Sequence, residues 1–303
     1  MKEDRYAIKL EREHYPIVEK YLDDPRYNNV LVIGLTTPGT RSSLRRFLNI
    51  KNRVERRGGN CIGIEHPEVC ELLDEYIALK AVEGDFDFLK KGFPSSIGYL
   101  IDLAEKSGDL SEIQSYFKCW LEGKLYGQTA QNVRDILASS LGELAHNLSL
   151  HNKIMEEIGI VYDDAKELKT IKDESIDLIL AFGLFGELDL TKFQHRYYTE
   201  SIRDRFSLRH EEVIKEIKEI LETYERRCEE VVDSMYRVLK PKGKCIISND
   251  NEEQLTEFKS IIEKLGYQPK YDQEFYRKLF GKKFSDIKVF NGSARYLMVC
   301  EKE

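Results

Sequence analysis

The stretch "VVDSMYRVLKPKGKCIIS" (residues 231–248) contains the end of a helix, a turn and a buried strand. Upstream of it, apolar residues recur at three- and four-residue steps, which predicts an amphipathic helix. The helix is expected to end at "KPKGK" (240–244), where proline and glycine interrupt the pattern. "CIISND" (245–250) is a short apolar run typical of a buried strand. A helix that turns directly into a buried strand indicates an α/β fold.

Other apolar runs of the same kind are spread along the chain. They are "NVLVIG" (29–34), "NCIGIE" (60–65), "IGIVYDDA" (158–165) and "SIDLILAF" (175–182). Helical patterns cover 40–57, 67–82 and 252–266, so strands and helices alternate. Because the runs are apolar throughout, the strands are expected to be covered on both faces.

Two more strands are predicted at the end of the chain, in "YQPKYDQEF" (267–275) and "ARYLMVCEKE" (294–303). We therefore expect a Rossmann-like, mainly parallel sheet with helices on both faces and an antiparallel hairpin at its C-terminal edge. The part of the chain without good strands contains three amphipathic segments, near 95–106, 111–122 and 128–156. The predicted domains are an N-terminal helical entry (1–28), a sheet domain (29–83 and 158–303) and a helical insertion (84–157).

The composition narrows the function classes. The 303 residues are 41% hydrophobic, which is enough for a sizeable core, and the net charge of −7 argues against a general nucleic-acid coat. The six cysteines form no CxxC pair and the six histidines are scattered, so we expect reduced thiols and no metal site. The charged N-terminus does not resemble a signal peptide and no apolar run is long enough to span a bilayer, which favours a cytoplasmic protein without a membrane partner.

Ligands of open parallel sheets bind beyond the carboxyl ends of the strands. At these positions the sequence has glycines after the first strand, acids after the second and third, and an aromatic at the end of the fourth. The predicted ligand-binding residues are Gly34, Thr36, Gly39, Glu65, Asp164, Ala181 and Phe182. Glycines let a ligand approach the backbone, Glu65 can accept both ribose hydroxyls, Asp164 can accept an adenine amine, and Phe182 can flank the ring. The pattern therefore indicates a nucleoside-containing ligand.

Three stretches resemble class I S-adenosylmethionine-dependent methyltransferases. "VVDSMYRVLKPKGKCIIS" is similar to the helix, turn and strand before and within their fifth strand. "VYDDAKELKTIKDESIDLIL" (161–180) is similar to their passage from strand three to strand four, and "CIGIEHPEV" (61–69) to strand two with its ribose-binding acid. The resemblance implies a methyltransferase whose cofactor is S-adenosylmethionine.

A narrower resemblance concerns "LILAFGLFGELDLTKFQHR" (178–196), which is similar to the region around the (D/N/S)PPY motif of DNA and RNA base amino-methylases. It implies that Phe185 stacks on a flipped base. Asp189 and His195, which follow the motif, become candidate proton acceptors. With Phe185 they form the predicted catalytic set, and a nucleic-acid base is the implied acceptor.

Two other functions stay open at this point. Phe182 occupies the place of the polar group that holds the target amine in base amino-methylases, and Val32 and Ile33 replace the acid that ends their first strand. These replacements favour the alternative of a catalytically inactive methyltransferase-fold module that binds nucleic acid or protein. A nicotinamide-dependent dehydrogenase on a similar sheet is a third hypothesis.

Two basic stretches are candidate nucleic-acid surfaces. The first lies in 41–57, and the second, in 270–288, interleaves lysines with aromatic residues. Their candidate contacts are Arg41, Arg45, Arg46, Lys51, Arg53, Lys278 and Lys282. Equally, the first could be a solvated helix face and the second a half-buried edge strand. The sequence does not indicate an oligomeric state.

Overall fold

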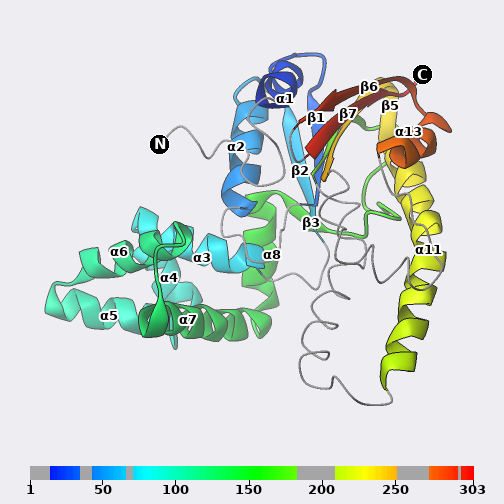
Figure 1. Cartoon of the computed structure of the whole chain (residues 1–303). Helices are drawn as coiled ribbons and strands as arrows, with labels where there is room; N and C mark the ends of the chain where they lie inside the picture. Colours follow the sequence, from blue (N-terminus) through cyan, green and yellow to red (C-terminus); the bar gives the residue numbers. More distant parts are fainter. Residues whose placement is uncertain (1–13, 35–42, 66–70, 183–208, 251–272, 293–294) are drawn as a thin grey trace. The chain divides into compact units, whose positions relative to one another are not determined.

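The computed structural model describes residues 14–34, 43–65, 71–182, 209–250, 273–292 and 295–303 (Figure 1). The chain divides into two compact units. The sheet unit is Met1–Gly34, Asn52–Ile64 and Asp163–Glu303, and the helical unit is Leu35–Lys51 and Glu65–Tyr162. The domain boundaries expected from sequence, at residues 28, 83 and 157, stay predictions.

Seven strands form one sheet in the order β3-β2-β1-β4-β5-β7-β6. They are β1 (Asn29–Ile33), β2 (Asn60–Glu65), β3 (Ile160–Tyr162), β4 (Ile176–Phe182), β5 (Leu239–Asp250), β6 (Ser285–Asn291) and β7 (Arg295–Glu301). Pairing is parallel between β1 and β2, β1 and β4, and β4 and β5. It is antiparallel between β5 and β7 and between β7 and β6. The predicted fold class, with its antiparallel hairpin at the C-terminal edge, is confirmed (Figure 1).

The helices of the described residues alternate with these strands or lie between β2 and β3. They are α1 (Tyr15–Leu22), α2 (Ser43–Glu55), α3 (Glu71–Glu83), α4 (Phe86–Gly92), α5 (Ile97–Ser107), α6 (Leu110–Leu121), α7 (Gly127–Ala145), α8 (Leu148–Ile158), α11 (Arg209–Val238) and α13 (Gln273–Gly281). The pattern over 128–156 predicted one helix, but Asn147 ends it and starts α8, because its side chain accepts a hydrogen bond from the Leu150 N–H at 3.1 Å. Within the described ranges, no helix is long and apolar enough to cross a membrane.

The centre of the sheet is apolar on both faces, as the continuous apolar runs predict. Leu178, Ile179 and Leu180 of β4 are all fully buried. On one face α11 packs against β5, where the Cys245 Sγ lies 3.8 Å from the Met235 Sδ. Both faces of such a strand are covered by apolar side chains. A polar residue therefore avoids a desolvation cost only near the ends of the strand.

The sequence predicts a turn at 240–244 between helix and strand, but β5 begins at Leu239, directly after the last residue of α11. The strand begins at Leu239, which pairs with Ile176, and the next paired residue is Lys244, opposite Leu178. Residues 240–243 therefore bulge out of the ladder. Gly243 fits this bulge because a Cβ atom there would lie 2.8 Å from the Lys240 carbonyl oxygen.

The predicted strand over 267–275 is wrong where the structure describes it, because α13 begins at Gln273. Tyr276, Leu279 and Phe280 are buried at steps of three and one, which is the spacing of a helix face and not of a strand. The C-terminal hairpin is made instead by β6 and β7. The helix predicted over 252–266 lies outside the described residues.

In the helical unit, α3 to α8 have their own core. Ile97 and Ile101 of α5 and Leu137 of α7 are at most 1% exposed. The hydroxyl groups of Ser96 and Ser140 form a hydrogen bond of 2.8 Å within this core, so these two buried polar atoms satisfy each other.

Candidate functional site

The parallel strands of the sheet end level with one another. Ile33 of β1 pairs with Ile64 of β2 and with Ala181 of β4. Phe182, the last residue of β4, pairs with Ser248 of β5. The carboxyl ends of β2, β1, β4 and β5 thus form one edge, called the carboxyl edge below, and ligands of open α/β sheets bind at this edge.

Gly34, the residue after β1, has a φ of 73°. A side chain is strained in this left-handed region, so glycine suits this position. Val32 and Ile33 before it are buried apolar residues, which means that the last residues of β1 provide no acid. Thr36 and Gly39, predicted to contact the ligand, lie outside the described residues.

The last residue of β2 is Glu65, a residue of which only 6% is exposed. Burial of a charged group is costly unless polar groups or a ligand satisfy it. Its side chain is the acceptor that the sequence predicts for two ribose hydroxyls.

The ends of β4 and β5 have different surroundings. Ala181 is fully buried, whereas Phe182 is half-buried. In β5, Ser248 and Asn249 are buried polar residues, and the Asn249 Nδ2 lies 3.5 Å from the Tyr296 hydroxyl. This amide therefore has a partner in β7 and is held in the core.

The loop after β3 contains two acids that differ in their surroundings. Asp163 accepts hydrogen bonds from the Asp164 N–H (2.8 Å), the Thr170 N–H (2.7 Å) and the Thr170 hydroxyl (2.6 Å). Burial would raise the pKa of Asp163, but these hydrogen bonds outweigh it and hold the pKa below its usual value. The Asp164 carboxylate accepts a hydrogen bond from the Lys166 N–H (2.9 Å) and pairs with the Nζ of the same residue (3.2 Å).

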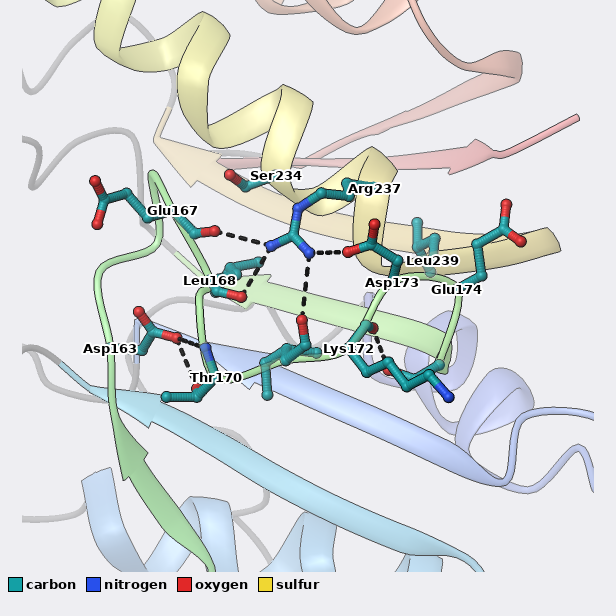
Figure 2. A network of polar contacts seen from close by, with 12 residues as sticks. Asp163, Glu167, Leu168, Thr170, Lys172, Asp173, Glu174, Ser234, Arg237 and Leu239 are labelled. Carbon is teal, nitrogen blue, oxygen red and sulfur yellow. Dashed lines mark hydrogen bonds and ion pairs between the residues drawn. The ribbon is translucent and has the colours of Figure 1, made fainter.

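The same loop is bound to the end of α11 by Arg237, as Figure 2 shows. Its guanidinium donates to the carbonyl oxygens of Glu167 and Leu168 (both 2.9 Å) and Ile171 (3.3 Å), and to the Asp173 carboxylate. Ser234, one turn earlier in α11, donates its hydroxyl to the Lys166 carbonyl oxygen at 2.5 Å. Arg237 is the arginine of "RVLKPKG", but the sequence alone assigns it no role.

In the helical unit, the N-terminus of α2 already has an anionic partner. The carboxylate of Glu75, a residue that is 2% exposed, accepts a hydrogen bond from the Leu44 N–H at 2.9 Å. A carboxylate at a helix N-terminus satisfies a free N–H and interacts favourably with the helix dipole.

Several of the basic residues predicted to contact nucleic acid have partners within their own unit. Arg53 pairs with Asp23 and Glu19, and the Lys51 Nζ donates to the Glu157 carbonyl oxygen. Lys282 pairs with Glu229 at 2.5 Å, and Lys278 lies 3.9 Å from the Glu274 carboxylate. Arg41 lies outside the described residues, as do Phe185, Asp189 and His195, so the predicted catalytic set stays a prediction.

Comparisons with known proteins find similar solved structures but no matching family. No family model matches the chain, and no curated protein matches it. An S-adenosylmethionine-dependent methyltransferase from Archaeoglobus fulgidus is 13% identical, with 96% of this chain and 95% of that chain covered and a TM-score of 0.39. Phospholethanolamine N-methyltransferase 2 of Haemonchus contortus, solved with S-adenosylhomocysteine, is 10% identical, with coverages of 96% and 52% and a TM-score of 0.41. With scores this low, these likenesses carry no inference about ligand or activity.

Proposed function

We propose that the chain is a class I methyltransferase that uses S-adenosylmethionine. The observation that carries this proposal is the strand order β3-β2-β1-β4-β5-β7-β6, in which β7 is antiparallel to both neighbours. Dinucleotide-binding sheets have the order 3-2-1-4-5-6. Here the antiparallel β7 lies between β5 and β6 instead, and this antiparallel C-terminal edge favours a methyltransferase fold over a dehydrogenase.

The residues of the carboxyl edge fit such a cofactor. Gly34 allows a close backbone approach after β1, and Glu65 places a buried carboxylate at the end of β2, where ribose hydroxyls can be bound. Asp164 retains a side chain that is 33% exposed, which suits an adenine amine. When it is bound, the sulfonium of the cofactor supplies an activated methyl group. The chain's task is then to orient the acceptor in line with that group and to take up its proton.

The cap on α2 argues against the dehydrogenase. In dinucleotide-binding folds, the pyrophosphate lies at the N-terminus of the helix that follows the first strand. Here the buried Glu75 carboxylate occupies the Leu44 N–H of that helix. S-adenosylmethionine has no phosphate, so its binding does not require this N-terminus to hold a pyrophosphate.

For the methyl acceptor we keep a nucleic-acid base as the proposal, on the resemblance of residues 178–196 to base amino-methylases. In this proposal Phe185 stacks on the base, and Asp189 and His195 are the candidate proton acceptors. The half-buried Phe182 at the end of β4 is the feature that favours the inactive binding module instead. Transfer of labelled methyl groups to a cellular RNA or DNA fraction supports the enzyme, and cofactor binding without transfer to any fraction supports the module.

Calorimetry tests cofactor use. Titration of the protein with S-adenosylhomocysteine is expected to give a dissociation constant of about 10 μM or lower, or about −7 kcal/mol. Titration with NAD⁺ is the control and is expected to give no heat, because of the Glu75 carboxylate. If neither S-adenosylmethionine nor S-adenosylhomocysteine gives a heat of binding, the proposal is wrong. A heat of binding with NAD⁺ alone would support the dehydrogenase.

A further inference from the structure

The loop between β3 and β4 is held by one side chain from a distant part of the chain. Arg237 lies 66 to 70 residues away from the three loop carbonyl groups that it binds. A guanidinium is planar and always charged, and its fork of N–H groups can bind several fixed oxygens at once. Arg237 therefore fixes the backbone of residues 167–171 from a rigid helix, as Figure 2 shows.

The backbone of this loop needs such support. Leu168 has a φ of 43°, a left-handed conformation that is unfavourable for a residue with a side chain. It is retained because the Leu168 side chain is fully buried and its carbonyl oxygen is bound by Arg237. The Glu167 and Leu168 N–H groups both donate to the Asp164 carbonyl oxygen, at 2.9 and 2.8 Å. The turn fixed by Arg237 is thus the turn that begins at Asp164.

The two acids of the loop have separate roles in this arrangement. The Asp163 carboxylate accepts three hydrogen bonds from within the loop, so it organises the loop itself. The Asp164 carboxylate lies on the turn that Arg237 fixes and keeps a third of its side chain exposed. Of the two, Asp164 is the acid that has room for a further donor.

We propose that Arg237 is a positioning residue, which holds Asp164 where its carboxylate accepts the exocyclic amine of an adenine. This inference rests on the proposed function, since it assigns Asp164 to the nucleoside of the cofactor. Arg237 itself touches no ligand and acts through the loop backbone. Ser234 assists it by binding the Lys166 carbonyl oxygen.

The test compares Arg237→Lys with Arg226→Lys in the full chain. Arg226 is the matched control, because it lies on the same helix but is 68% exposed and lies 3.9 Å from its partner Glu230. Without ligand, hydrogen exchange of the Glu167, Leu168 and Thr170 amides is expected to be at least about tenfold faster in Arg237→Lys and unchanged in Arg226→Lys. Unchanged exchange in both variants overturns the positioning role, whatever the cofactor proves to be.

The second readout is ligand discrimination. Wild-type protein is expected to bind S-adenosylhomocysteine at least about tenfold more tightly than its inosine analogue, in which a carbonyl replaces the adenine amine. In Arg237→Lys this ratio is expected to fall towards one, and in Arg226→Lys it is expected to be kept. Faster exchange with an undiminished ratio would overturn the inference and leave the proposed function intact. A wild-type protein that binds neither ligand would overturn the proposed function, and the adenine contact assigned to Asp164 would fall with it.

Discussion

Replacement of Asp177 by Asn is expected to lower the free energy of unfolding by about 2 kcal/mol, the range for losing hydrogen bonds to a charged group. Asp177 is the second residue of β4, and its side chain is 13% exposed. It accepts hydrogen bonds from the Asn29 N–H (2.8 Å) and Nδ2 (3.0 Å) and pairs with the Lys240 Nζ at 2.7 Å. One carboxylate thus joins the starts of β1, β4 and β5, and an amide would leave Lys240 without this ion pair.

The effect is expected to depend on pH. Burial would raise the pKa of Asp177, but Lys240 and Asn29 outweigh it and hold the pKa below its usual value. A carboxyl with a lowered folded-state pKa contributes stability above its unfolded-state pKa of about 3.9 and loses it as the pH falls further. Urea unfolding should therefore show the full difference between wild type and variant at pH 7 and a shrinking difference below about pH 4.

Asp233→Asn is the control for this prediction. Asp233 also pairs with a lysine, Lys283 at 3.1 Å, but it is 56% exposed, so its loss should cost less than about 1 kcal/mol. Equal losses for Asp177→Asn and Asp233→Asn would contradict the role given to Asp177.

Replacement of Gly243 by Val is expected to destabilise the fold by about 3 kcal/mol or more, because it inserts a side chain into a filled space. A Cβ atom there would lie 2.8 Å from the Lys240 carbonyl oxygen, 3.0 Å from the Leu239 Cδ2 and 3.2 Å from the Asp177 carbonyl oxygen. Two of these atoms belong to the backbone, so the bulge of 240–243 would have to shift and would disturb the Asp177–Lys240 pair.

Gly281→Ala is the matched control, since its Cβ would meet only the Ile287 Cδ1 at 3.7 Å, an ordinary contact. Thermal unfolding is expected to show a large decrease in Tm for Gly243→Val and a change of no more than about 2 °C for Gly281→Ala. An unchanged Tm in the Gly243 variant would mean that the joint between α11 and β5 is looser than described.

The strands were the most predictable part of the fold. The bounds of "NCIGIE" (60–65) match β2, and "NVLVIG" and "SIDLILAF" differ from β1 and β4 by one residue each. Continuous apolar runs are readable because a strand covered on both faces has no polar side to obscure the pattern. Residues 273–275 were predicted as part of a strand, although they begin α13. The amphipathic run that follows Gln273 and Glu274 is too short for a helical period to be evident in the sequence.

The candidate site was predictable only in part. Strand ends can be read from sequence, which is why Gly34, Glu65 and Asp164 could be placed at or near strand ends; their contacts with a ligand stay a prediction. Arg237 belongs to a recognisable motif, but its partners are mainly backbone carbonyl groups about 70 residues away. Every residue has such a group, so the sequence does not indicate which of them Arg237 binds. Glu75 was missed for a related reason, because its partner is the Leu44 backbone N–H on another helix.

The most direct test of the central claim is a crystal structure of the protein grown with S-adenosylhomocysteine. We expect the nucleoside at the carboxyl edge, with its ribose hydroxyls bonded to Glu65 and its adenine amine bonded to Asp164. A structure in which Glu65 and Asp164 contact no ligand, although S-adenosylhomocysteine was present in excess, would contradict the account.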